Sequence, residues 1–326
     1  MTRVDLANLR AALTAAFGAE RVHADAALAP FTTFKVGGPA DLLLEPRSGE
    51  EMVRACAFAR EAGAPVTVLG GGSNVLVGDG GVRGLVLRPR AGVITEESPY
   101  RVRADAAATI NELVRWTIGR GLAGLEAWAG TPGTVGGGVY GNAHWGGRLL
   151  GDLIESVRLL RPDGTIADVP SGQMEFGYDR SRLQRTGEVL VSARFVLDAG
   201  EPASLRAIAR QSLAYRKRTQ PLHVPSAGCI FQNPAPGEAV PDGVPRSAGA
   251  LVDRAGLKGE RVGGAVVSPT HGNFIVNEGG ATAADIRALI ERCRSAVSVR
   301  FGVALRDEIV RLGEFPRESE VPCPPC

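Results

Sequence analysis

Residues 130–147 read GTPGTVGGGVYGNAHWGG, a segment in which glycine alternates with hydroxyl and amide side chains. A shorter segment of the same kind, GGGSN, occupies residues 70–74, and Gly37-Gly38 precedes both. Backbone N–H groups that no Cβ shields form concavities that bind anions. Several such loops converging on a diphosphate predict a dinucleotide site, whose hydroxyl and amide groups are those of Ser73, Asn74, Thr131, Thr134 and Asn142. The alternative is that these glycines only form tight turns.

Two other interpretations of these motifs are disfavoured. Gly136, Gly138 and Gly141 satisfy G-x-G-x-x-G, but the preceding AWAGTP is not the apolar strand that a Rossmann fingerprint requires. No P-loop motif occurs.

The four histidines show no paired spacing, and the terminal Cys323-Pro324-Pro325-Cys326 lacks a second pair of ligands. We therefore expect no metal site.

Helical and strand patterns alternate on both sides of the glycine segments, which predicts an α+β fold. Residues 70–81 are too glycine-dense to be predicted as either element. Leu6, Leu9, Leu13 and Phe17 fall at helical spacing. The predicted strands are 40–45, 65–69, 82–87, 154–160, 165–169, 189–197 and 303–312, and the predicted helices are 49–62, 108–121, 203–218 and 282–298. The expected domains are an N-terminal helix (1–18), two subdomains (19–90 and 91–200), a third domain (201–315) and a disordered tail (316–326).

Composition limits the function classes. The chain has 326 residues, of which 44% are hydrophobic and 22% charged, as in ordinary globular proteins. A net charge of only +2 gives no support to nucleic-acid binding through bulk charge. No run of 18 apolar residues occurs, charged residues interrupt the N-terminus, and five scattered cysteines form no disulfide framework. We expect a cytoplasmic protein with no membrane partner, working as a monomer.

Seven segments together resemble the UDP-N-acetylenolpyruvoylglucosamine reductase (UDP-N-acetylmuramate dehydrogenase) family. They occur in the family's order and extend across residues 31–313. In this chain they read FTTFKVGGPA (31–40), VLGGGSNVLV (68–77), GTPGTVGGGVYGNA (130–143), FGYDRS (176–181), RTQPLHVPSAGCIFQNP (218–234), SAGALVDRAGLKGERVGGAVVSPTHGNFIVN (247–277) and FGVALRDEIVRLG (301–313). The short connection at residues 197–203 resembles that of the shorter, type II branch.

The resemblance implies a fold and a reaction. The fold is two α+β subdomains that clamp FAD, as in vanillyl-alcohol-oxidase-type flavoproteins, followed by a C-terminal α+β substrate domain. NADPH reduces the flavin, a hydride passes from flavin N5 to C3 of the enolpyruvyl ether, and a protein acid protonates C2. The product is UDP-N-acetylmuramate, a peptidoglycan precursor.

The resemblance also implies the site residues. The cofactor-binding set is Gly70, Gly71, Gly72, Ser73, Asn74, Thr131, Pro132, Gly133, Thr134, Gly137 and Asn142, and the substrate-binding set is Lys217, Asn233 and Tyr178. Glu308 matches the family's catalytic glutamate. Cys229 stands where the family has its proton-donating serine, and a thiol, with an ordinary pKa of about 8.5, is still mostly protonated near pH 7.

The catalytic arginine is displaced in this chain. The family pattern places arginine directly after tyrosine, but Tyr178 is followed by Asp179 and then Arg180. We expect Arg180 to take the catalytic role, which is electrostatic stabilisation of charge on the substrate carboxylate. The alternative is that Arg182 or another cation supplies it. Gln232 also departs from the family, which usually has lysine there.

Two other functions are compatible with parts of the sequence. One is a different FAD oxidoreductase of the same fold, such as a sugar or lactone oxidase, which would lack the SAGCIFQNP and LRDEIV segments. The other is a flavin-binding or nucleotide-sugar-binding module without catalysis, which only the departures at Asp179 and Cys229 favour.

Overall fold

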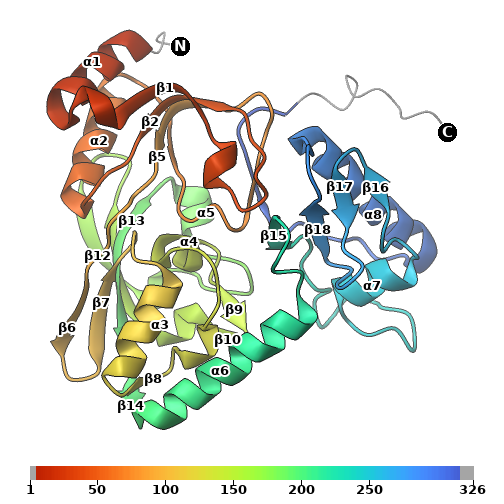
Figure 1. The fold of residues 1–326 in the computed structure, drawn as a ribbon. Coiled ribbons are helices and arrows are strands. Elements are labelled where there is room, and N and C mark those ends of the chain that lie inside the picture. The colour runs from red at the N-terminus through yellow and green to blue at the C-terminus, as the bar shows by residue number, and fades with distance from the viewer. Residues whose placement is uncertain (1–4, 316–326) are drawn as a thin grey trace. The chain divides into compact units, whose positions relative to one another are not determined.

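The computed structural model describes residues 5–315 (Figure 1). Its α-helices are α1 (Leu6–Phe17), α2 (Gly49–Glu61), α3 (Ile110–Gly119), α4 (Val135–Tyr140), α5 (Leu183–Thr186), α6 (Pro202–Thr219), α7 (Ala248–Arg254) and α8 (Ala283–Phe301). None of the helices in this span is both long and apolar enough to cross a membrane.

The strands form three larger sheets and three pairs. The first sheet has the order β1-β2-β5-β3, with β1 (Val22–Ala27), β2 (Pro39–Leu44), β3 (Val66–Val68) and β5 (Val82–Leu87). The second has the order β12-β11-β13-β7-β6, with β6 (Ile94–Ser98), β7 (Arg101–Asp105), β11 (Ile154–Leu160), β12 (Ile166–Pro170) and β13 (Val189–Val196). The third has the order β15-β18-β17-β16, with β15 (Ser226–Cys229), β16 (Arg261–Val262), β17 (Ala265–Val267) and β18 (Phe274–Asn277). The pairs are β4 (Val75–Val77) with β19 (Val310–Leu312), β8 (Leu122–Ala123) with β14 (Asp198–Ala199), and β9 (His144–Trp145) with β10 (Arg148–Leu149).

The described chain divides into two compact units. Unit 1 comprises residues 5–24, Leu42–Gly71 and Gly84–Arg216, and unit 2 comprises Asp25–Asp41, Gly72–Arg83 and residues 217–315. The borders expected near residues 90 and 200 do not coincide with the ends of these units. The assignment of FAD and substrate domains along the chain therefore stays a prediction.

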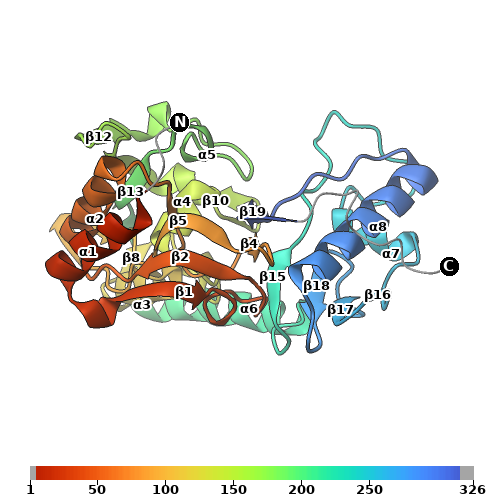
Figure 2. The ribbon, with the colours of Figure 1, turned by 90° about the horizontal axis from the view of Figure 1, so that it is seen from above.

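Unit 1 contains two hydrophobic cores. In the first, α1 and α2 lie side by side (Figures 1 and 2) and bury Leu9, Leu13 and Met52 with Leu44 and Leu85 of the first sheet. In the second, α3 and α4 pack with the five-stranded antiparallel sheet. A capping box begins α3, because the Thr109 hydroxyl accepts from the Glu112 N–H while the Glu112 carboxylate accepts from the Thr109 N–H.

In unit 2, α8 packs against the third sheet (Figure 2). Ile286, Leu289 and Ile290 of α8 are completely buried in this core. The predicted capping box at Thr282 and Asp285 is confirmed, and it begins the helix at Ala283.

Several predicted elements have the bounds that the sequence indicated, such as β5 and β11. Two local predictions were wrong, and one helix was not predicted. Residues 75–77 form β4 despite the surrounding glycines, because they pair with β19. Residues 135–140, for which no element was predicted, form α4, because the Thr134 hydroxyl caps the helix by accepting from the Gly137 N–H. The predicted strand 303–312 is regular only at Val310–Leu312. The predicted tail, 316–326, lies outside the described residues.

Candidate active site

Two glycine segments of unit 1 approach each other backbone to backbone. A Cβ added to Gly71 would lie 2.6 Å from Gly133 Cα, and one added to Gly70 would lie 2.5 Å from Thr134 Oγ1. Real side chains do not fit at such distances, so glycine is required here. We call these four residues the glycine cradle. It brings together the two segments from which the sequence predicted a dinucleotide site.

Backbone hydrogen bonds hold the second half of the glycine cradle in place. The Ile110 N–H donates to the Gly133 carbonyl at 3.0 Å, and the Val135 N–H donates to the Ala108 carbonyl at 2.8 Å. The neighbouring Pro132 and Gly137 are exposed. The loop is therefore fixed by α3 and its cap, and its surface is accessible to a ligand.

Arg216 is a residue of this region that the sequence interpretation missed. Its side chain is buried on α6, donates to Thr131 Oγ1 at 2.8 Å and lies with its guanidinium carbon 3.5 Å from the Trp145 ring centroid. The sequence carries no motif that indicates this role, which the burial of the side chain on α6 reveals. A fixed cation is thereby attached to the predicted cofactor loop of unit 1.

Asn142 is completely buried and has a left-handed φ of 45°. Its Oδ1 accepts from the Gly151 N–H at 2.7 Å, and its Nδ2 donates to the Gly177 carbonyl at 2.7 Å. Both the oxygen and the nitrogen of the side-chain amide therefore form hydrogen bonds within unit 1. Asn142 thus supports the turn that follows Gly177, and its predicted contact with the cofactor stays a prediction.

That turn carries Arg180, the predicted counterpart of the family arginine. Gly177 and Arg180 exchange backbone hydrogen bonds of 3.0 and 3.2 Å, and Asp179 adopts a φ of 52° between them. The Asp179 carboxylate lies 3.0 Å from His144 Nδ1, and the His144 ring packs against the Tyr178 ring at a tilt of 46°, with centroids 4.6 Å apart. The position directly after Tyr178 therefore holds an acid paired with histidine.

The two candidate arginines differ in their surroundings. The Arg182 guanidinium makes two hydrogen bonds to the Glu188 carboxylate, at 2.8 and 2.5 Å, which raise the pKa of Arg182 and hold the pKa of Glu188 below its usual range. Arg180 is exposed, and its guanidinium makes no hydrogen bond within residues 5–315. The Arg182 guanidinium is therefore engaged in an ion pair within the fold, whereas the Arg180 guanidinium is accessible to a ligand.

In unit 2 the structure brings Cys229 and Glu308 onto neighbouring backbone segments. Cys229 ends β15 and pairs with Phe274 of β18. The next residue, Ile230, accepts a 2.7 Å hydrogen bond from the Glu308 N–H, and Phe231 forms an isolated bridge with Asp307. Cys229 and Glu308 are both half-buried. The predicted proton donor and the predicted carboxylate thus lie in one small region.

The neighbouring acid, Asp307, has a separate environment. It forms ion pairs with Arg294 of α8 and, at 2.7 Å, with Arg311. Its carboxylate is therefore engaged in ion pairs within unit 2, which gives Asp307 a structural role.

Asn273, which the sequence indicated as structural or substrate-adjacent, supports the segment after Cys229. Its Oδ1 accepts from the Phe231 N–H at 2.9 Å and its Nδ2 donates to the Phe231 carbonyl at 2.7 Å. The side-chain amide acts as a strand partner would.

The remaining predicted residues are distributed between the units. Gly72, Ser73 and Asn74 belong to unit 2, unlike Gly70 and Gly71. The predicted substrate residue Asn233 accepts from the Ala248 N–H at 2.9 Å at the start of α7, and Lys217 is exposed on α6.

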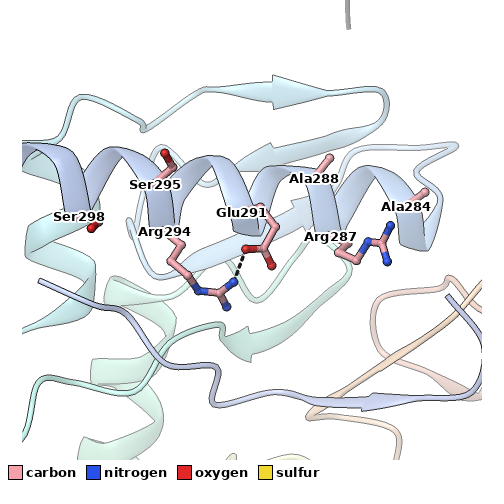
Figure 3. A pocket seen from close by; sticks show the side chains of 7 residues that line it. All are labelled: Ala284, Arg287, Ala288, Glu291, Arg294, Ser295 and Ser298. Atoms are coloured by element: carbon pink, nitrogen blue, oxygen red, sulfur yellow. Dashed lines mark hydrogen bonds and ion pairs between the residues drawn. The ribbon is translucent and has the colours of Figure 1, made fainter. Parts of the chain in front are cut away.

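A hollow of about 570 Å³ runs along α8 (Figure 3). Its lining consists of Ala284, Arg287, Ala288, Glu291, Arg294, Ser295 and Ser298. Arg294 and Glu291 form an ion pair there. The hollow contains no predicted site residue and no thiol.

Comparison with known proteins identifies relatives of both halves of the chain. A family model described as "FAD binding domain" matches residues 40–170, and one described as "UDP-N-acetylenolpyruvoylglucosamine reductase, C-terminal domain" matches residues 220–312. The UDP-N-acetylenolpyruvoylglucosamine reductase of Anaeromyxobacter dehalogenans (strain 2CP-1) is 42% identical over 303 residues, covering 90% of this chain and 87% of the relative. The protein of the same name from Moorella thermoacetica is 42% identical over 287 residues, covering 88% and 92%.

A solved structure agrees with these relatives. The crystal structure of UDP-N-acetylenolpyruvylglucosamine reductase from Thermus caldophilus has a TM-score of 0.73 and 33% sequence identity to this chain. The match covers 89% of this chain and 98% of that one.

Proposed function

Since the chain belongs to the UDP-N-acetylenolpyruvoylglucosamine reductase family of FAD-dependent oxidoreductases, we propose that it reduces UDP-N-acetyl-3-O-(1-carboxyvinyl)-glucosamine to UDP-N-acetylmuramate with NADPH. The expected family and the FAD-binding fold followed by the family's C-terminal domain are confirmed. The proposal places the enzyme in cytoplasmic synthesis of peptidoglycan precursors, as a monomer.

The residues of unit 1 fit a flavin dinucleotide. The glycine cradle, where a Cβ on Gly71 would meet Gly133, leaves backbone N–H groups unshielded, as a bound diphosphate requires. Thr134 of the cradle contributes a hydroxyl group, and Thr131 in the same loop offers another. Bound there, FAD would supply the chemistry of hydride transfer between NADPH and the enolpyruvyl group.

The observation that carries the proposed chemistry is the pairing of the Glu308 segment with the backbone after Cys229. Reduction of a vinyl ether adds a hydride to C3 and a proton to C2. We assign the proton to the Cys229 thiol, which becomes a thiolate and regains a proton from solvent. We assign to Glu308, on the neighbouring backbone segment, the role of a second acid–base group.

Charge on the substrate requires cations and amides of the protein. Hydride addition increases negative charge on the conjugated carboxylate, and we assign its stabilisation to the accessible Arg180. Lys217, Asn233 and Tyr178 are the proposed substrate-binding residues.

Anaerobic titration tests this function against its two alternatives. NADPH should bleach the FAD-loaded protein, and the enolpyruvyl nucleotide should then restore the oxidised spectrum rapidly. Faster reoxidation by oxygen than by the nucleotide would indicate an oxidase. A protein that binds no FAD, or whose FAD NADPH does not reduce, would contradict the proposal.

A further inference from the structure

Residues 72–83 belong to unit 2 and lie far along the chain from the part of that unit that begins at residue 217. Within this segment β4 pairs in parallel with β19, with Val75 opposite Val310. The Asp79 carboxylate accepts hydrogen bonds of 2.9 Å from both the Ala283 and Ala284 N–H groups at the start of α8. These contacts fix both ends of the segment.

Asn74, just before β4, is joined to the backbone around Glu308. Its Nδ2 donates to the Glu308 carbonyl at 3.1 Å, and its own carbonyl accepts from the Val310 N–H at 2.9 Å. The Glu308 N–H donates in turn to Ile230. Both peptide groups of Glu308 therefore have a partner, one on the Cys229 side and the other on Asn74.

The backbone needs these partners because Glu308 lies outside regular secondary structure. It falls between the isolated bridge at Asp307 and the first residue of β19, Val310. Without a strand ladder, the direction of its side chain depends on individual hydrogen bonds. The motif assigned Asn74 to cofactor binding, and the structure uses one N–H of its side-chain amide for the Glu308 carbonyl.

We propose that Asn74 is a positioning residue for Glu308, and that its amide fixes the carboxyl group for the proton-transfer half of the reaction. The catalytic part of this proposal rests on the proposed function. An amide suits the position because it offers a neutral N–H donor to a carbonyl. An aspartate has the same shape but only acceptor oxygens when ionised.

The test uses Asn74→Asp, which removes the donor at nearly constant volume, in the full-length FAD-loaded enzyme. Amide hydrogen exchange at residues 308–310 should accelerate about 5- to 10-fold, which corresponds to the loss of one hydrogen bond of about 1 to 1.4 kcal/mol. Reoxidation of the reduced enzyme by the enolpyruvyl nucleotide should slow by about 10- to 100-fold, as misplaced catalytic groups do. FAD affinity and reduction by NADPH should change less than about 2-fold.

Asp79→Ala is the matched control, because it removes the α8 caps from the same segment. It should lower the unfolding temperature and leave reoxidation unchanged. Equal slowing in this variant would show general weakening of unit 2 and contradict a specific role of Asn74.

Two further outcomes would overturn the proposal. Unchanged exchange at residues 308–310 in Asn74→Asp would show that the amide does not fix this backbone. Loss of FAD, with both half-reactions slowed alike, would make Asn74 a flavin ligand instead.

Failure of the wild-type enzyme to react with the enolpyruvyl nucleotide would overturn the proposed function and, with it, the catalytic part of this proposal. The exchange experiment would still decide whether Asn74 fixes the backbone at Glu308.

Discussion

The Glu308 N–H donates a 2.7 Å hydrogen bond to the carbonyl of Ile230, the residue that follows Cys229. This bond joins two segments that are distant in the sequence and makes the backbones of Cys229 and Glu308 neighbours within unit 2. Asn273 supports the same segment through its amide contacts with Phe231. The pair therefore lies on a backbone that several hydrogen bonds fix, as acid–base catalysis requires.

Replacement of Cys229 separates proton donation from packing. Cys229→Ser keeps a transferable proton and should retain substantial activity, whereas Cys229→Ala should slow reoxidation by the enolpyruvyl nucleotide about 100-fold or more. Stopped-flow absorbance of the flavin measures this step. Reduction by NADPH serves as the internal control and should be unchanged in both variants. Wild-type turnover in the alanine variant would remove Cys229 from the mechanism.

Arg180 and Arg182 offer a matched pair of cations two residues apart. Arg180→Ala should slow the reaction with the enolpyruvyl nucleotide about 100-fold and leave the free energy of unfolding unchanged, because its guanidinium is exposed. Arg182→Ala should instead lower the free energy of unfolding by about 1–3 kcal/mol, since it leaves Glu188 without its partner. Denaturant titration and stopped-flow kinetics measure the two effects. A slower reaction in Arg182→Ala, together with lower stability in Arg180→Ala, would give the catalytic role to Arg182.

The contribution of Glu188 to stability has a definite pH dependence. Arg182 lowers the pKa of Glu188 in the folded state, so this pair stabilises the fold at pH values above the ordinary carboxyl pKa. The contribution is lost as the pH falls through the lowered pKa. The difference in the free energy of unfolding between wild type and Arg182→Ala should therefore have its full value at pH 6 and become smaller below about pH 4. A difference that widens in acid would contradict this coupling.

Local chemistry explains which parts of the fold could be predicted from the sequence. The capping box at Thr282 and Asp285 places the start of α8 within a residue, because cap and helix are neighbours in the chain. β4 could not be predicted, since three residues among glycines become a strand only by pairing with β19, more than 200 residues later. Long-range pairing overrides local propensity in this way.

The site residues also differ in whether the sequence could predict them. Motif resemblance indicated Cys229 and Glu308, but only the structure shows that their backbones are neighbours. The choice between Arg180 and Arg182 depends on Glu188, which pairs with Arg182 through folding of the turn. No motif marks such a partner.

Thiol labelling should single out Cys229 among the described cysteines. Burial raises the pKa of Cys56 to about 11 and that of Cys293 to about 12, so fewer than about 1 in 1,000 of either is thiolate at pH 7.5. In a Cys323→Ser, Cys326→Ser background, iodoacetamide at pH 7.5 should modify Cys229 first, as peptide mass spectrometry would show. The thiolate fraction rises about tenfold per pH unit below the pKa, so labelling of Cys56 should increase before that of Cys293 as the pH is raised. Early labelling of Cys293 at pH 7.5 would contradict its burial.

The glycine cradle gives a prediction that does not depend on turnover. A methyl group on Gly71 would meet the Gly133 backbone at 2.6 Å, so Gly71→Ala must force the two loops apart. FAD affinity, measured by quenching of flavin fluorescence, should fall at least about 10-fold, since the displaced N–H groups no longer converge on one anion. Gly119→Ala is the control, because a Cβ at that end of α3 meets no atom within 4 Å and should stabilise the helix by about 0.5–1 kcal/mol. Equal FAD affinity in Gly71→Ala and wild type would show that the flavin does not depend on the close approach of these two loops.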